Sequence, residues 1–163
     1  MPVSINLSRL DFELCDIFEI TERYRRLYNV PREMLDIEIT ESALGDDSTQ
    51  LQAGVRNFRA AGYQIWVDDF GSGYSSLNNL LDYDFDVLKL DLEFLRTYDR
   101  NPRAAELIKC IVNGANDMGV APLQEGVETA EQGKELIGLG CNYAQGYYYS
   151  KPIPMEEYEE RYL

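Results

Sequence analysis

Short apolar runs, often β-branched, alternate along this chain with longer segments of helical periodicity. The alternation predicts repeated strand and helix units around a parallel sheet, so the expected fold class is α/β. The predicted strands are Pro2–Asn6, Leu35–Thr40, Gln64–Asp69, Asp86–Asp91, Val120–Glu125 and Tyr143–Tyr149. Helices are expected over Asp16–Tyr28, after the cap residues Ser48 and Asn101, and after the capping box of Thr129 and Gln132. The 163 residues are expected to form one domain without a second.

Polar side chains end or follow each predicted strand. They are Asn6; Glu38, Thr40 and Glu41; Asp68 and Asp69; Lys89 and Asp91; Glu125 and Glu128; and Gln145. In a parallel barrel all strand C-termini open on the same face, so groups distant in sequence converge at one mouth. The sequence therefore predicts a single site built from these side chains.

Several of these residues also have a structural interpretation. Asn6 could cap a turn, and Lys89, embedded between leucines, could be the salt-bridge partner of the acids. Glu38 has apolar neighbours on both sides, where an unpaired carboxylate is costly. Asp68 and Asp69 are adjacent and repel unless a positive group holds them. The acids therefore indicate a bound cation.

The residue types restrict the chemistry. The chain contains no histidine, which removes the commonest general base and the commonest transition-metal ligand. Carboxylates with one amide favour a hard divalent cation, so Mg²⁺ or Mn²⁺ is expected. Such ions stabilise both oxygens of an in-line phosphoryl displacement. A two-metal phosphoryl-transfer site is therefore a reasonable hypothesis.

The formal charge of −14 would repel a nucleic-acid backbone, so polymeric DNA or RNA is not expected as a partner. The first residues lack the cationic start and apolar run of a signal peptide, and no stretch approaches the roughly 20 apolar residues of a membrane span. A cytoplasmic location is expected. The cysteines, Cys15, Cys110 and Cys141, suggest buried reduced thiols, with neither a disulfide framework nor a zinc site.

The segments INLS, EITES, DDFGSGYSS, KLD, QEGVET and QGYYYSKP follow one another along the whole chain. In this order and spacing they resemble the EAL-domain cyclic di-GMP phosphodiesterases. DDFGSGYSS and EGVET are specific together, whereas INLS or KLD alone would be weak. The resemblance implies a TIM-like (β/α) barrel. It also implies hydrolysis of cyclic di-GMP to linear pGpG with Mg²⁺ or Mn²⁺.

The resemblance also implies roles for individual residues. Asn6, Glu38 and Asp68 resemble ligands of the first metal, Asp68 and Asp69 resemble the shared and second-metal ligands, and Glu128 resembles a companion metal ligand. Lys89 would orient the nucleophilic water, and Glu125 resembles a residue that is either general base or metal ligand. Glu41 resembles the anchor of the DFGSG loop, and Asp91 and Gln145 would lie on the ligand side.

The chain also departs from the family pattern. It contains no EAL tripeptide and begins at what resembles the third barrel strand, so about six of the eight strands are expected. Gln124 stands where the family usually has alanine and is expected to crowd the site. An incomplete barrel exposes strand edges, which predicts self-association and weak or no hydrolysis by this chain alone.

Two alternatives to a fragment of an active phosphodiesterase remain open. The chain could be a degenerate EAL module that binds cyclic di-GMP or a protein partner without catalysis. It could also be another metal-dependent barrel, such as an enolizing enzyme, although DDFGSGYSS together with EGVET argues against that.

Overall fold

The computed structural model describes residues 2–45, 48–72, 83–98 and 101–162. Its strands are β1 (Val3–Leu7), β2 (Leu35–Thr40), β3 (Gln64–Phe70), β4 (Val87–Leu90), β5 (Ala121–Gln124) and β6 (Tyr143–Ala144). In the described part of the chain they form one sheet in the order β1-β2-β3-β4-β5-β6, and each strand runs parallel to its neighbours. The predicted α/β fold with a parallel sheet is confirmed.

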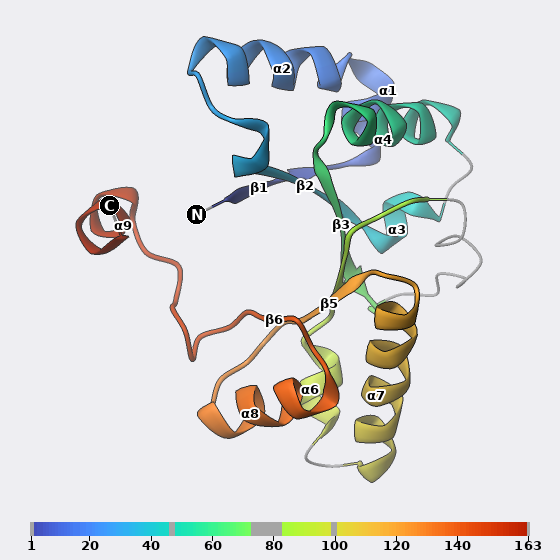
Figure 1. Cartoon of the computed structure of the whole chain (residues 1–163), viewed down its shortest axis with the longest axis vertical. Helices are drawn as coiled ribbons and strands as arrows, with labels where there is room; N and C mark the ends of the chain where they lie inside the picture. The colour runs from blue at the N-terminus through green and yellow to red at the C-terminus, as the bar shows by residue number, and fades with distance from the viewer. Residues whose placement is uncertain (1, 46–47, 73–82, 99–100, 163) are drawn as a thin grey trace.

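The helices lie between the strands. They are α1 (Arg9–Leu14), α2 (Ile17–Leu27), the 3₁₀ turn η1 (Arg32–Met34), α3 (Glu41–Leu44), α4 (Thr49–Ala61), α6 (Glu93–Tyr98), α7 (Pro102–Asp117), α8 (Ala130–Leu139) and α9 (Met155–Tyr162). Figure 1 shows α1, α2 and α4 beside the first half of the curved sheet and α6, α7 and α8 beside the second half. This layering is the one expected of repeated strand–helix units.

The predicted helix starts are present. The Ser48 hydroxyl accepts a hydrogen bond from the Leu51 amide at 3.3 Å, and the Asn101 side chain accepts one from the Arg103 amide at 3.0 Å. The capping box of Thr129 and Gln132 forms at the start of α8. These caps satisfy backbone N–H groups that have no partner inside their own helix.

The last strand is much shorter than predicted. The expected strand Tyr143–Tyr149 is only β6, and residues 147–149 form a turn instead. Gly146 packs so closely on the backbone of Val127 that a Cβ atom there would lie 2.2 Å from the Val127 carbonyl oxygen. The Tyr148 amide then donates to the same oxygen at 3.0 Å. The chain leaves the sheet at this contact.

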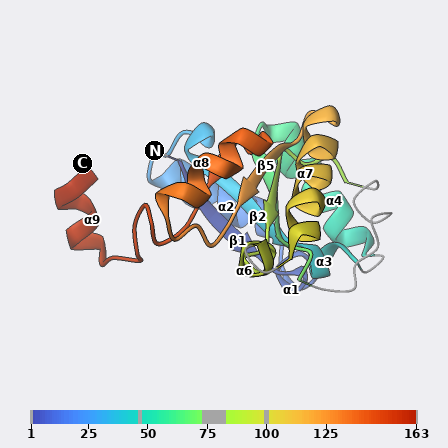
Figure 2. The same ribbon diagram turned by 90° about the horizontal axis from the view of Figure 1, so that it is seen from below.

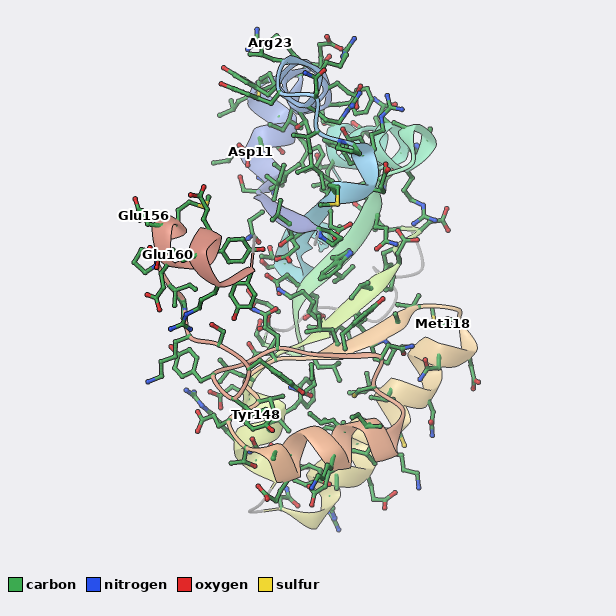
Figure 3. The ribbon with its side chains drawn as sticks, turned by 60° about the vertical axis from the view of Figure 1, so that its left-hand side comes forward. Asp11, Arg23, Met118, Tyr148, Glu156 and Glu160 are labelled. Atoms are coloured by element: carbon green, nitrogen blue, oxygen red, sulfur yellow. The ribbon has the colours of Figure 1, made fainter. Side chains whose placement is uncertain are left out.

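The six strands form an incomplete barrel. Within the described residues, β1 and β6 end the sheet and each pairs with one neighbour only. The C-terminal helix α9 has no buried residue, and Figures 1 and 2 show it apart from the helices that lie along the sheet. Its residues Glu156 and Glu160 accordingly lie away from the sheet in Figure 3. In the part of the chain that the structure describes, Figures 1 and 2 show helices along the outer side of the curved sheet and none on its inner side.

A buried ion cluster connects α2 with the entrance to β3. Glu22, only 4% exposed, accepts from Nε of Arg25 and Nε of Arg32, each at 2.9 Å, and from the Tyr63 hydroxyl at 2.7 Å. The hydrogen bonds from Arg32 and Arg25 lower the pKa of Glu22 despite its burial. Burial, followed by the bond to Glu22, raises the pKa of Tyr63 to about 12. Glu22 is therefore charged in the folded state at neutral pH.

Loss of a hydrogen-bonded charge costs about 2 kcal/mol of unfolding free energy. In a domain of this size we therefore expect Glu22→Gln to lower Tm at pH 7 by roughly 4–8 °C. Because folding lowers the pKa of Glu22, its contribution is present above the unfolded value of about 4.3 and disappears as pH falls. The difference in Tm between wild type and variant should therefore narrow at pH 3. Thermal unfolding followed by circular dichroism tests this, with the exposed Glu19→Gln as control, and an equal difference at both pH values would contradict it.

Candidate functional site

The ammonium group of Lys89 is the centre of the site. It lies 2.7 Å from Asp68 Oδ1, 2.9 Å from Glu125 Oε1 and 3.1 Å from Glu38 Oε2. The three carboxylates come from three other strand ends, at β2, β3 and the residue after β5. Lys89 itself is only 3% exposed. The salt-bridge interpretation of Lys89 is thus observed, and these four of the predicted strand-end residues lie together.

Strand alternation explains how these side chains meet. Successive residues of a strand face opposite sides, so Lys89 faces the inner side of the curved sheet while Leu88 and Leu90 face the helices. Leu88 and Leu90 belong to the apolar core, as alternation requires. Burying an ammonium is unfavourable unless it is paired, and three carboxylates pair it here.

Three of the acids are close enough to share a metal ion. Asp68, Asp69 and Glu125 each offer a carboxylate oxygen, and these oxygens lie within 4.8 Å of one another. All three side chains are partly buried. Oxygen donors without nitrogen or sulfur suit Mg²⁺, Mn²⁺ or Ca²⁺. The donor set therefore fits the hard divalent cation expected from the sequence.

The backbone of Asp69 allows two adjacent carboxylates to face one site. In a regular strand Asp68 and Asp69 would point to opposite faces. Asp69 instead has a φ of +57°, and the pairing of β3 with β4 shifts register between Val67 and Phe70. Such a bulge redirects side chains locally. The two acids thereby meet in the same cluster.

The charges in the cluster shift one another's pKa values. Burial alone would lower the pKa of Lys89, but its hydrogen bonds to Asp68 and Glu125 and the nearby negative charges raise it. Burial raises the pKa of Glu125, and Lys89 opposes this. Burial and then the charges of Asp68 and Asp91 raise the pKa of Asp69. The Lys89 ammonium thus remains charged at neutral pH, whereas the pKa values of Glu125 and Asp69 are raised.

Glu41 contacts the loop that follows the acid pair. Its side chain is buried, and its Oε2 accepts a hydrogen bond from the Gly71 amide at 2.9 Å. Gly71 has a φ of +92°, and a Cβ atom there would lie 2.4 Å from the Phe94 ring. Glycine is therefore required at this position. The part of DDFGSGYSS from Gly73 onward lies outside the described residues.

The other predicted site residues lie around this cluster. Asn6 pairs in register with Glu38 on the neighbouring strand and is exposed. The Asp91 carboxylate accepts from the Glu93 amide at 2.8 Å, at the start of α6. Glu128 and Gln145 are exposed and lie outside the acid cluster. They line, together with Glu125, a cavity of about 700 Å³ between α6, the segment before α8 and the segment after β6.

The expectation that Gln124 crowds the site is wrong. Glu125 faces Lys89 on the inner side, so its neighbour Gln124 faces the opposite side, toward the helices. Gln124 does not line the cavity, and its amide hydrogen-bonds to backbone carbonyls instead. The family resemblance identifies Gln124 as an unusual residue, whereas the alternation of β5 determines that its side chain faces away from the site.

Asp36 is a notable acid that the strand-end pattern missed. It lies two residues before Glu38, on the same face of β2, and is 6% exposed. In the described part of the chain its carboxylate has no hydrogen bond or ion pair. Burial, followed by the charges of Glu38 and Asp86, raises its pKa. The alternation LDIE could have revealed it, because Asp36 and Glu38 share a face.

Removing the central cation should destabilise the fold. We expect Lys89→Met to lower the free energy of unfolding in EDTA by about 3 kcal/mol, since Glu38, Asp68 and Glu125 are left without their counter-ion. Mn²⁺ should restore part of this loss by replacing the positive charge. Urea unfolding with EDTA and with Mn²⁺ measures both effects, with the exposed Lys134→Met as control. A Lys89→Met chain as stable as wild type in EDTA would disprove the central role of the ammonium.

Known proteins share both sequence and fold with this chain. It is 32% identical over 166 residues to the cyclic di-GMP phosphodiesterase PdeR of Escherichia coli (strain K12), covering 100% of this chain and 25% of PdeR. The EAL enzyme Bd1971, in a cAMP- and cyclic-di-GMP-bound form, superimposes with a TM-score of 0.92 at 28% identity, covering 98% of this chain and 42% of that one. Klebsiella pneumoniae BlrP1, in a manganese/cy-diGMP complex at pH 6, superimposes with a TM-score of 0.85 at 27% identity. The match covers 93% of this chain and 39% of the BlrP1 chain.

The chain spans a third or less of the length of the curated relatives that it matches. The model of the family described as the EAL domain matches residues 1–152, which include every strand and all the acids around Lys89. The incomplete barrel, the strand-end acids and this match agree, and the chain belongs to the EAL domain family.

Proposed function

We propose that this chain carries the metal and phosphate chemistry of a cyclic di-GMP phosphodiesterase, which hydrolyses one phosphodiester bond to give linear pGpG. The observation that carries the proposal is the gathering of Asp68, Asp69 and Glu125 within 4.8 Å, beside the ammonium of Lys89. The PdeR relative and the cyclic-di-GMP complexes of similar EAL structures support this choice of substrate.

We assign the metal to the oxygen donors of the inner face. Asp68 and Asp69 would hold Mg²⁺ or Mn²⁺, with Glu38, Asn6 and Glu128 completing two neighbouring sites. Asn6 and Glu38 are cross-strand neighbours on one face, which supports a shared role. When bound, the divalent ions supply charge stabilisation and water activation for phosphoryl transfer.

The remaining residues take positioning and proton-transfer roles. Lys89 orients the attacking water, and Glu125 either accepts its proton or ligates metal. Hydrolysis joins the water oxygen to phosphorus and breaks the bond from phosphorus to the 3′ oxygen, which leaves with a proton. Glu41 holds the loop after the acid pair, and its bond to Gly71 supports this role. Asp91 and Gln145 lie on the ligand side.

We further propose that residues 1–163 form the part of an EAL domain from its third strand to its last, and that hydrolysis by this chain alone is weak. The sheet that ends at β1 and β6 supports this. The chain also contains no EAL tripeptide, whose glutamate the family resemblance implies as a further ligand of the first metal. A metal site short of one carboxylate binds its ion less tightly, and misplacement of the ion lowers the rate.

We also propose a cytoplasmic location. The expectation that the cysteines are buried is wrong, because Cys15 and Cys110 are exposed and Cys141 is half-buried, all three as free thiols. Exposed free thiols persist in a reducing compartment, which supports the proposal. None of the described helices is both long and apolar enough to cross a bilayer.

Incubation of the chain with cyclic di-GMP and Mn²⁺, followed by chromatography, should give slow formation of pGpG. Glu125→Gln should lower the rate by roughly 100-fold, since a general base or a ligand is lost. Asp69→Asn, which keeps the left-handed backbone, should weaken Mn²⁺ binding at least about tenfold. Glu131→Gln, exposed in the first turn of α8, is the matched control.

The outcomes of this experiment separate the two functions. Calorimetric binding of cyclic di-GMP without any pGpG would favour a module that binds the nucleotide or a partner without catalysis. If the chain neither bound nor hydrolysed cyclic di-GMP, the proposal would be rejected for this chain. Product formed equally well in EDTA would refute the metal assignment.

Self-association is the second expectation for the isolated chain. β1 and β6 leave backbone N–H and C=O groups unpaired, and such edges pair with other chains. We expect a dimer or larger species in size-exclusion chromatography with light scattering. Val3→Lys, at an exposed position of β1, should shift the chain toward monomer, whereas Leu107→Lys on α7 should not. A monodisperse wild-type monomer that melts cooperatively would contradict this.

A further inference from the structure

Gln124 is the last residue of β5 and precedes the site residue Glu125. Its side chain is completely buried, with 0% exposure, on the helix side of the sheet. The hydrogen bonds of its amide nitrogen all reach backbone oxygens and none reaches a carboxylate of the acid cluster. A buried amide in this position must act through the backbone.

The amide nitrogen of Gln124 joins two strand ends. It donates to the carbonyl oxygens of Leu90 and Asp91, both at 3.1 Å, and to that of Glu125 at 2.9 Å. The Leu90 oxygen also accepts from the Glu125 amide at 3.1 Å, and the Asp91 oxygen accepts from the Phe94 amide at 3.2 Å. One side chain therefore bridges the end of β4, the first turn of α6 and the backbone of Glu125.

These backbone segments carry side chains that meet on the other face of the sheet. Lys89 directly precedes Leu90, and its ammonium lies 2.9 Å from Glu125 Oε1. The junction is tightly packed, since a Cβ atom at Gly126 would lie 2.6 Å from Leu92 Cβ. A shift of the β5 end relative to the β4 end would therefore move Glu125 relative to Lys89.

The side-chain oxygen Oε1 of Gln124 has no hydrogen-bond partner among the described residues, although it is buried. An unpaired buried acceptor costs about 1–3 kcal/mol, which offsets much of the gain from the donor side. The three neighbouring carbonyl oxygens require a donor, so the amide nitrogen faces them and the side-chain oxygen points away. The Gln124 amide thus fixes the relative position of the backbone segments that it binds and contributes little net free energy of folding.

We propose that Gln124 is a positioning residue, whose amide fixes the Glu125 backbone against the end of β4 and so sets the metal affinity of the Asp68–Asp69–Glu125 cluster. This inference rests on the proposed function, because it requires that the cluster binds a divalent ion. It concerns placement only, since the Gln124 side chain contacts the backbone of Glu125 but no carboxylate of the cluster, and it does not line the cavity.

Gln124→Met keeps the length of the side chain and removes its donors, so it tests the proposal with little change in volume. Mn²⁺ binding to the whole chain is followed by electron paramagnetic resonance of the free ion. We expect roughly tenfold weaker binding, as is usual when a group supporting a ligand is lost. Gln124→Glu, which turns an oxygen toward the three carbonyl oxygens, should bind Mn²⁺ more weakly still.

The control is Val112→Ala, a buried cavity-forming change in α7 that lowers stability but removes none of the hydrogen bonds of Gln124. It should leave the Mn²⁺ affinity unchanged, even where its Tm falls as far as that of Gln124→Met. Equal Mn²⁺ affinities of Gln124→Met and wild type would overturn the proposal. So would equal losses of affinity in Gln124→Met and Val112→Ala, because stability alone would then explain the effect.

Hydrogen exchange separates this inference from the proposed function. The amides of Glu125 and Phe94 donate to the oxygens that Gln124 also binds, so both should exchange about tenfold faster in Gln124→Met. The Ile37 amide on distant β2 should not change. Unchanged exchange at Glu125 would overturn the positioning role even if Mn²⁺ binds. A wild-type chain that binds no Mn²⁺ would reject the proposed metal binding by the acid cluster. Hydrogen exchange of the Glu125 amide would then still decide whether Gln124 holds the backbone in place.

Discussion

The pairing of one buried ammonium with three carboxylates governs the inner side of this sheet. Lys89 reaches Glu38, Asp68 and Glu125 only because β2, β3, β4 and the end of β5 lie side by side and run in the same direction. A slip of one residue in any pairing would turn the partner away from Lys89. The polar contact and the apolar core therefore specify the same register, one from each face of the sheet.

Much of the fold and the position of the site followed from local rules. Apolar runs ending in polar groups located the strands, and caps such as Ser48 and Asn101 located helix starts. Alternation indicated that Lys89 and its partners share a face. These signals depend on a few neighbouring residues, which is why the amino-acid sequence contains them.

What the sequence did not reveal depends on contacts between distant segments. The strand at Tyr143 ends early because Gly146 meets Val127, a contact without a local signature. The Gln124 side chain binds the backbone oxygens of Leu90 and Asp91, 34 and 33 positions away, and the Glu22–Tyr63 bond joins residues 41 positions apart. Helix α9 has helical periodicity but no buried residue, so its position follows from neither pattern nor packing.

The left-handed backbone at Asp69 restricts how this position can change. Among common residues only glycine, asparagine and aspartate adopt such a conformation at low cost. A chain that lost the carboxylate here without losing stability would therefore carry asparagine or glycine. Asparagine would keep an oxygen donor in place and remove its charge. Related chains with asparagine at this position would thus preserve the shape of the site while binding a divalent ion more weakly. This single substitution would turn a metal-dependent enzyme into a domain that binds its ligand without catalysis.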